Sequence, residues 1–301
     1  MRLLCSGDTI GLIAPADWTP DDLLEAGEAR LQALGYRTRR HAGLTGRKGR
    51  LAGPDEMRRR AVEEGFADPE MAALLCVAGG YGSGRLLGSL DYGLIGRNPK
   101  PLVGYSDITA LLIAIHAETG METFHGPVLK EIAKGEVPVG ERALLALLEG
   151  RFPAAEIASL NRAARPIVAG EATGRLIGGN LTLLHSLVGT PWMPKDLTGR
   201  ILFVEDWREP LYHLDRMLFH LRQTGLFEGL AGLIVGRIAE IDERPAGLGG
   251  DIDHLLAEHF ADAPYPVATN AAIGHAQDKA TLPIGRRVTM RIGDEGLTLA
   301  D

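Results

Sequence analysis

Short apolar runs alternate with segments of helical periodicity along the first half of the chain. Compact apolar runs at 9–14 and 73–78 are typical of strands buried on both faces of a parallel sheet. Between them, the pattern predicts helices over 21–34, where Gly35 ends the period, and over 55–66. Three further short strands are expected, at 36–40, 102–103 and 121–124. Strands and helices in alternation predict a doubly wound α/β domain, with its ligand site beyond the carboxyl ends of the strands.

The second half has more strand character. Apolar runs predict three strands, at 172–177, 199–204 and 230–238. Helical periodicity predicts three helices, over 181–188, 212–221 and 252–260. Residues 266–275 have no clear period and are expected to be irregular, whereas 288–299 is expected to form a closing hairpin that turns at Gly293. The second half is therefore predicted to be a mixed α/β domain.

Regularly spaced apolar residues become rare between the two halves of the chain. Few periodic apolar residues occur over 151–169, and we expect this segment to be a linker. It would divide the chain into an N-terminal α/β domain over 1–150 and a C-terminal domain over 170–301. A chain of 301 residues is long enough for two domains of this size.

Composition narrows the class of protein. With 45% hydrophobic and 24% charged residues, the chain resembles an ordinary soluble globular protein. A net charge of -7 argues against a nucleic-acid partner, which usually requires a basic face. No apolar run reaches membrane-spanning length, and the N-terminal residues lack a long apolar run and a cleavage motif, so we expect no secretion leader. We therefore expect a cytoplasmic protein that binds neither nucleic acid nor membrane.

A serine stands at an abrupt turn between a predicted strand and a predicted helix. In Gly104-Tyr-Ser-Asp, Ser106 follows the apolar run at 102–103. Serine is a preferred N-cap, so Ser106 could simply cap the helix. Alternatively, the turn is a nucleophile elbow that exposes the serine Oγ next to a helix N-terminus, which favours developing negative charge. The second glycine of the elbow motif is absent, so this stretch alone leaves both interpretations open.

An acidic residue and a histidine could act together with a nucleophilic Ser106. Glu205 follows the buried strand at 199–204, where it is either a solvated strand end or a group that serves a site. His275 lies in a loop of small residues, where a histidine is either exposed and idle or catalytic. Ser106, Glu205 and His275 follow the chain order of nucleophile, acid and base in α/β-hydrolases, although geometry and not order defines a triad.

A glycine loop, Gly79-Gly-Tyr-Gly-Ser-Gly, follows the strand at 73–78. Such a loop lets backbone N–H groups come close to a ligand, which suits an oxyanion hole. A phosphate loop is the alternative, but neither the G-K-[ST] ending nor a spaced G-x-G-x-x-G is present. No pair of histidines or cysteines has metal-ligand spacing, so we expect no metal.

Several motifs occur in one order along the chain. They include Gly79-Gly-Tyr-Gly, Gly104-Tyr-Ser-Asp-Ile-Thr-Ala-Leu, His125-Gly-Pro, Gly178-Gly-Asn-Leu, Leu202-Phe-Val-Glu-Asp and Gly274-His. Together they resemble the LD-carboxypeptidases, the S66-type serine peptidases. The resemblance runs from Ile10 to about Gly285, which is nearly the whole chain.

The resemblance implies a triad of Ser106, Glu205 and His275, and an oxyanion hole of backbone N–H groups that we place at Gly80 and Asp107. It implies a flavodoxin-like N-terminal domain, a C-terminal domain with a β-barrel-like sheet, and a site between them. Family members are commonly homodimers and need no metal or cofactor. The implied reaction releases the terminal D-alanine of murein tetrapeptides during cytoplasmic wall recycling.

Two further residues are candidates for substrate binding. Arg85, after the glycine loop, could bind the substrate carboxylate, although a surface arginine is an equally good interpretation. Trp207 could stack a ring, as a microcin-C-type peptidase would need for a nucleotide-like group. A microcin-C-type amide hydrolase is therefore an alternative. A non-catalytic binder of muropeptides or nucleotides that uses the glycine loop is another.

Overall fold

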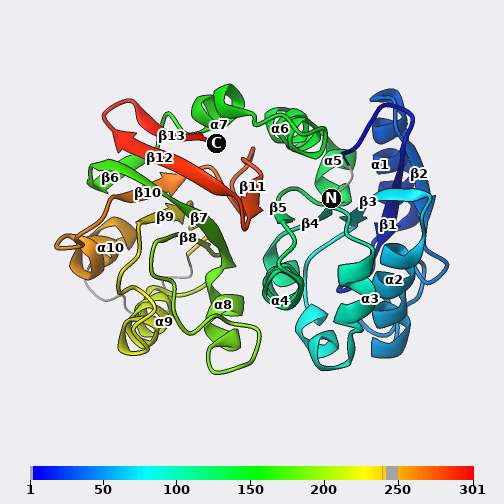
Figure 1. Ribbon diagram of the computed structural model, residues 1–301, viewed down its shortest axis with the longest axis horizontal. Coiled ribbons are helices and arrows are strands. Elements are labelled where there is room, and N and C mark those ends of the chain that lie inside the picture. The colour runs from blue at the N-terminus through cyan, green and yellow to red at the C-terminus, as the bar shows by residue number, and fades with distance from the viewer. Residues whose placement is uncertain (1–2, 239, 242–249) are drawn as a thin grey trace.

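Two β-sheets lie side by side, with helices packed around them (Figure 1). The computed structural model describes residues 3–238, 240–241 and 250–301. The first sheet has six strands in the order β11-β5-β4-β3-β1-β2. The second has seven strands in the order β13-β12-β7-β8-β9-β10-β6. No helix in these described ranges is long and apolar enough to cross a membrane.

Five parallel strands from the first half of the chain form most of the first sheet. They are β1 (Thr9–Ile13), β2 (Arg37–Arg40), β3 (Met71–Cys76), β4 (Leu102–Gly104) and β5 (Thr123–His125). Their spatial order, 2-1-3-4-5, is that of flavodoxin-like sheets. Strands β1, β3 and β4 are buried along their whole length, which explains their continuous apolar sequence. The predicted flavodoxin-like fold is confirmed.

The helices of the first half lie between these strands or, for the last two, follow β5. They are α1 (Asp21–Ala33), α2 (Asp55–Ala67), α3 (Tyr92–Arg97), α4 (Thr109–Thr119), α5 (Leu129–Lys134) and α6 (Pro138–Leu148). Helix α4 is apolar on every side because it contacts α8 and β7 of the second half as well as β4 and β5 of its own sheet. In Figure 1 it lies near the middle of the molecule, between the two sheets.

The second sheet is mixed and strongly curled, which agrees with the expected barrel-like sheet. Its strands are β6 (Arg165–Val168), β7 (Gly170–Asn180), β8 (Arg200–Glu205), β9 (Gly232–Gly236), β10 (Val267–Ala271), β12 (Arg287–Gly293) and β13 (Gly296–Ala300). Strands β7 to β10 run parallel, whereas β6, β12 and β13 pair antiparallel. The predicted hairpin is β12 and β13. The helices are α8 (Leu181–Leu187), α9 (Leu211–Gln223) and α10 (Ile252–Phe260).

Two segments differ from the sequence expectation. The expected linker over 151–169 contains α7 (Ala154–Leu160) and β6, which is the edge strand next to β10. The residues of β6 are mostly half-buried, as is usual at a sheet edge, so they show little apolar pattern. For this reason the sequence did not predict a strand there. The segment 266–275 contains β10, whose pairing with β9 is interrupted where Asn270 has a φ of +57°. The expectation of an irregular segment there was wrong for 267–271.

The chain returns to the first sheet near its C-terminus. Strand β11 (Leu282–Ile284) pairs antiparallel with β5, and Leu282 lies opposite His125. Residues 272–281 therefore cross from the second sheet, where β10 ends, to the edge of the first. This crossing segment carries His275 toward the carboxyl ends of β4 and β5.

Candidate active site

Ser106 lies directly beyond β4, on the strand-to-helix turn. Its φ is +63°, a left-handed conformation that is uncommon for residues other than glycine. Such strain is a feature of nucleophile elbows. The N-caps are Tyr105 for the 3₁₀ helix Ser106–Ile108 and Ile108 for α4, and neither accepts a side-chain cap bond. The N-cap interpretation of Ser106 is therefore wrong.

The packing of Ile108 explains how the turn at Ser106 forms without the second glycine of the elbow motif. Ile108 stands two residues after the serine, where the elbow motif has glycine. Its side chain lies against Gly104, where a Cβ would be 2.7 Å from Ile108 Cγ2. The close approach therefore requires glycine at 104 and permits a large residue at 108.

The glycine loop brings backbone close to Ser106. A Cβ on Gly79 would lie 2.9 Å from Ser106 Cβ and 3.3 Å from its Oγ, so only glycine fits without a shift. Gly80 has a φ of +107°, and a Cβ there would lie 2.1 Å from Asp17 Oδ2. Asp17 also accepts a hydrogen bond from the Tyr81 N–H at 3.1 Å. The loop thus lies beside Ser106. Asp17, which follows β1, holds it through the hydrogen bond from the Tyr81 N–H.

Asp107 connects the elbow to the glycine loop through its side chain. Its carboxylate accepts hydrogen bonds from the N–H groups of Gly82 at 3.0 Å and Ser83 at 2.8 Å. Burial raises the pKa of Asp107, while these N–H groups and the Ser83 hydroxyl act in the opposite direction. The two segments that flank the Ser106 Oγ therefore form one hydrogen-bonded unit.

Asp107→Asn is expected to lower the free energy of unfolding by about 1–3 kcal/mol, because the amide leaves one buried N–H without an acceptor. Urea unfolding measures the change. Asp91→Asn is the matched control, since Asp91 caps α3 through the Leu94 N–H at an exposed position and asparagine caps equally well. Equal unfolding free energies for the two variants would contradict the role given to Asp107.

Glu205 ends β8 and is completely buried. Its Oε2 accepts hydrogen bonds from His275 Nδ1 at 2.6 Å and from the His275 backbone N–H at 3.1 Å. An ionised carboxylate only accepts, so this contact assigns the proton to Nδ1 and leaves Nε2 able to accept a proton. Burial alone would raise the pKa of Glu205, but His275, with smaller effects of His125 and Lys279, holds it below its ordinary value.

Glycine is also needed directly before the histidine. Gly274 has a φ of +65°, and a Cβ there would lie 2.1 Å from Glu205 Oε2. The loop can therefore approach the carboxylate only with glycine at this position. The motif Gly274-His in the sequence thus has a steric explanation.

The aromatic ring of Tyr105 joins the two halves of the site. Tyr105 directly precedes Ser106, and its ring makes an edge-to-face contact with the His275 imidazole, with centroids 5.0 Å apart. His275 therefore lies next to the serine turn. Within the described ranges no hydrogen bond joins Ser106 Oγ to His275 Nε2. Catalytic hydrogen bonds commonly become short only when substrate is bound.

Comparison with known proteins identifies the family. The model of the LD-carboxypeptidase N-terminal domain matches residues 10–126, and that of the LD-carboxypeptidase C-terminal domain matches 173–290. The chain is 35% identical to the "Probable murein peptide carboxypeptidase" of Bacillus subtilis (strain 168), over 98% of this chain and 92% of the relative. This chain belongs to the LD-carboxypeptidase family. It is a serine-type carboxypeptidase.

Two solved structures of this family resemble the LD-carboxypeptidase described here. The muramoyltetrapeptide carboxypeptidase from Oxalobacter formigenes is 29% identical, with a TM-score of 0.83 and 97% of both chains covered. The structure of MccF in complex with glutamyl sulfamoyl guanosine is 25% identical, with a TM-score of 0.89, and covers 99% of this chain and 97% of that one. Both similarities extend over both sheets.

Of the two candidates for substrate binding, only Trp207 contacts the histidine of this LD-carboxypeptidase. Its indole stacks on the His275 imidazole with centroids 5.5 Å apart and the planes 9° from parallel. The Arg208 guanidinium lies 4.3 Å from the indole centroid. Arg85 instead forms a two-pronged ion pair with Asp55 of α2, at 2.9 and 2.6 Å, and no described contact links it to the triad candidates.

Asp206, next to Glu205, anchors this wall of the site. Its oxygens accept hydrogen bonds at 2.8–2.9 Å from the Asn180 side chain, from the N–H and hydroxyl of Thr182, and from the Trp207 N–H. Burial, and then the neighbouring Glu205, raise the pKa of Asp206 to about 6 although these donors favour the anion. Asp206 thus ties Trp207 to the end of β7 and the first turn of α8.

Sequence reasoning missed a buried ionic cluster beneath the serine turn. Lys279, almost completely buried, places Nζ 2.6 Å from Glu131 Oε1 and 4.0 Å from the Tyr105 ring centroid. The Tyr105 hydroxyl donates to the same Glu131 oxygen at 2.7 Å. The cluster fixes Tyr105 between α5 and the crossing segment 272–281. No local pattern marks Lys279, because its partner is distant in the chain.

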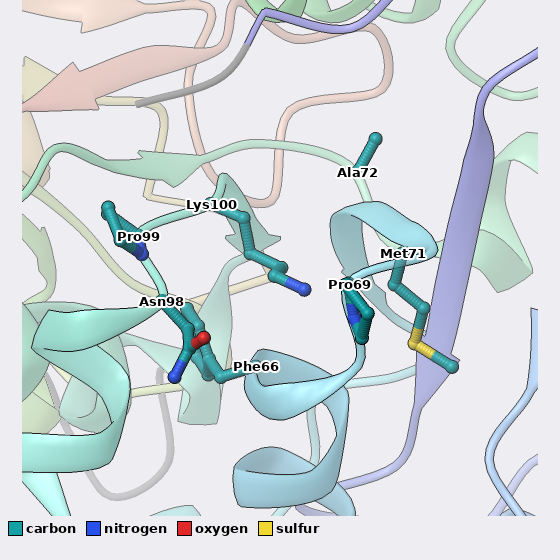
Figure 2. Close-up of a pocket in the computed structure, with 7 residues that line it drawn as sticks. All are labelled: Phe66, Pro69, Met71, Ala72, Asn98, Pro99 and Lys100. Atoms are coloured by element: carbon teal, nitrogen blue, oxygen red, sulfur yellow. The ribbon is translucent and has the colours of Figure 1, made fainter.

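The cavity in Figure 2 is not part of this site. It has a volume of about 160 Å³, and its lining comes from Phe66, Pro69, Met71, Ala72, Asn98, Pro99 and Lys100. These residues lie at the end of α2 and before or at the amino ends of β3 and β4, as Figure 2 shows. Ser106 lies at the opposite, carboxyl edge of the sheet. In the described ranges no group of three or more His, Cys, Asp or Glu side chains could hold a metal ion.

Proposed function

We propose that Ser106, His275 and Glu205 are the nucleophile, the general base and the orienting acid of this carboxypeptidase. We further propose that it cleaves the L,D-amide that joins the terminal D-alanine to a murein tetrapeptide. The main support is the 2.6 Å contact from the buried Glu205 to His275 Nδ1, next to the strained turn at Ser106. This contact leaves the opposite nitrogen of the imidazole available for the serine proton.

The chemistry follows from these positions. Ser106 Oγ attacks the carbonyl carbon while His275 Nε2 takes the hydroxyl proton. The C–N bond then breaks, the proton passes from Nε2 to the leaving amine, and D-alanine departs. Water, deprotonated by the same nitrogen, hydrolyses the acyl-enzyme and restores the serine. Glu205 stabilises the imidazolium in both steps without taking its proton.

We place the oxyanion hole at the backbone N–H groups of Gly80 and Asp107. The residue after the nucleophile supplies one such donor in α/β-hydrolases, and here that residue is Asp107. The close approach of Gly79 to the Ser106 Oγ supports the glycine loop as the source of the other. The Tyr81, Gly82 and Ser83 N–H groups donate to carboxylates, whereas among the described residues no such acceptor is seen for the Gly80 N–H, which supports its choice as the donor of the loop.

The murein substrate is supported by the names of the relatives, which act on murein peptides or muramoyl tetrapeptides. A microcin-type amide hydrolase is the second candidate, because MccF has the same fold and binds glutamyl sulfamoyl guanosine. Trp207, the residue considered for a nucleobase, already contacts the His275 ring and Arg208. This favours the peptide substrate. The Glu205–His275 contact argues against a non-catalytic binder.

We expect kcat/KM for D-alanine release from a murein tetrapeptide to exceed that for an aminoacyl-nucleotide analogue by about 100-fold or more, on the scale at which polar sites discriminate. Chromatographic product analysis measures both. A tetrapeptide that ends in L-alanine is the control for the stereochemistry of the bond. Faster cleavage of the nucleotide analogue would assign the microcin-type activity, and binding of either compound without turnover would assign a binder.

We also propose that the enzyme works as a homodimer in the cytoplasm, on murein peptides returned for recycling. The family resemblance and the murein peptide names of its relatives support this setting. Analytical ultracentrifugation should give twice the 32.2 kDa mass of the chain at working enzyme concentrations. A monomer mass at those concentrations would contradict the homodimer.

A further inference from the structure

A second buried histidine faces the carboxylate of Glu205. His125 ends β5 and is 1% exposed, and its Nε2 lies 3.8 Å from Glu205 Oε1. In the described part of the chain neither His125 ring nitrogen nor Glu205 Oε1 has a hydrogen-bond partner. An unpaired oxygen on a buried carboxylate is costly, so this arrangement requires an explanation.

The packing around His125 fixes its ring without satisfying its nitrogens. The rings of Tyr105 and Phe203 contact it edge to face, with centroids 6.0 and 5.2 Å away. Leu282 of β11 lies opposite it in the strand pairing. The imidazole is therefore held in one place by ring and apolar contacts, and its Nε2 lies 3.8 Å from Glu205 Oε1.

We propose that His125 is a positioning residue that acts on His275 through Glu205. The two oxygens of Glu205 then have separate partners: Oε2 holds His275, and Oε1 faces the Nε2–H of His125. At 3.8 Å this contact is longer than a hydrogen bond. It is a charge–dipole contact in a dry interior, where such interactions are strong. It restrains rotation of the carboxylate and so keeps the His275 imidazole aimed at the serine turn.

A neutral histidine suits this role better than a charged one. Burial lowers the pKa of His125 to about 4; Glu205 acts against this shift, whereas Lys279 and His275 add to it. The remaining ionisable group that faces His125 is Tyr105, whose hydroxyl is hydrogen-bonded to Glu131. A neutral imidazole supports the carboxylate without adding a positive charge, so the charge of Glu205 remains available to the imidazolium that forms on His275 during acyl transfer.

The inference rests on the proposed triad and is tested by three substitutions at one position. His125→Phe keeps a ring between Tyr105 and Phe203 but removes both nitrogens. We expect kcat for D-alanine release to fall by about 10- to 100-fold, by analogy with the loss of residues that orient metal-binding histidines from behind. KM should stay within about twofold, because His125 is buried away from the surface that a substrate can reach and its loss is expected to affect the transition state alone.

Two smaller polar substitutions separate positioning from packing. The Gln side chain can place its Nε2–H₂ near the position of the histidine Nε2, whereas that of Asn is too short. We therefore expect His125→Gln to recover most of the kcat and His125→Asn to remain as slow as the Phe variant. If the Phe variant does not fold, the comparison of His125→Gln with His125→Asn is sufficient to test the proposal. Equal kcat values for these two variants would overturn it.

A double-mutant cycle asks whether His125 acts through Glu205. In a Glu205→Gln background, His125→Phe should cause little further loss, because the charge that it positions is gone. Independent, multiplying losses would overturn the inference. His116→Phe is the control, since His116 is a partly buried histidine outside the site, and its Nδ1 is hydrogen-bonded to the Met121 carbonyl. An active Ser106→Ala variant would overturn the proposed triad. If Ser106→Ala is inactive and only the His125 variants differ from expectation, the His125 inference is wrong and the proposed triad is unaffected.

Discussion

Ser106→Ala is expected to abolish D-alanine release and to leave the protein folded. The Ser106 hydroxyl is the proposed nucleophile that forms the acyl intermediate, so its loss should reduce kcat by about a million-fold, as in other serine peptidases. Alanine suffers no more strain than serine at the φ of +63°. Measurements of D-alanine release and of the melting temperature would show inactivity at unchanged stability.

A covalent label provides the independent readout for this variant. A fluorophosphonate should attach to Ser106 in the wild-type protein and not in the Ser106→Ala variant. Ser159→Ala, at an exposed position of α7, is the matched control and should keep both activity and labelling. Turnover that survives Ser106→Ala, or a label on a different serine, would remove Ser106 from the mechanism.

Glu205→Gln should lower kcat by about ten-thousand-fold, comparable to loss of the orienting acid in other triads. The amide oxygen can still accept from His275 Nδ1 and from its backbone N–H, the two donors on Oε2. The variant therefore removes mainly the negative charge that stabilises the imidazolium. Steady-state kinetics on the murein tetrapeptide measure the loss, and circular dichroism checks the fold.

A surface pair of the same residue types is the control for this variant. Glu258 pairs with His254 at 3.2 Å across one turn of α10, and both side chains are exposed. Glu258→Gln should leave kcat unchanged, because solvent screens the pair and it lies outside the site. A loss of less than about tenfold in the Glu205→Gln variant would contradict the orienting role, since charge stabilisation in a dry site is worth far more.

The same substitution also changes how stability depends on pH. The pKa of Glu205 is lower in the folded protein than its ordinary value, so its stabilising contribution is present above the ordinary carboxyl pKa. That contribution disappears as the pH falls through the folded pKa. The unfolding free energy of the wild type should therefore decline toward that of the Gln variant in acid, as urea titrations at several pH values would show.

The parts of the fold that could be predicted from sequence are those with local patterns. Strands β1 and β3 are buried on both faces, so their apolar runs were visible. Helices α1 and α2 begin directly after prolines and carry acidic residues in their first turns. The strand order and the curled second sheet followed from the family resemblance. Helices α3, α5 and α6 were not predicted, and two of them have only six residues.

Segments without such patterns were misread for physical reasons. Strand β6 lies at a sheet edge and buries little of its surface, so 151–169 seemed to be a linker. Strand β10 is broken at Asn270, which interrupts its periodicity. Ser106 seemed equally suited to an N-cap, because its left-handed φ cannot be recognised from residue type. Edge pairing decides the first case and a left-handed backbone conformation the other two, and neither can be read from the local apolar pattern.

The sequence by itself determined the parallel sheet and the placement of Ser106 and Glu205 beyond the ends of apolar strands, because these depend on local burial and turn chemistry. Only the tertiary structure decided that His275 meets Glu205. The three residues of β11 carry no local signal, yet their pairing with β5 draws segment 272–281 across to the first sheet. The same pairing places His125 behind Glu205. Contacts between segments about 70 residues or more apart depend on how the sheets pack, which no short stretch of sequence specifies.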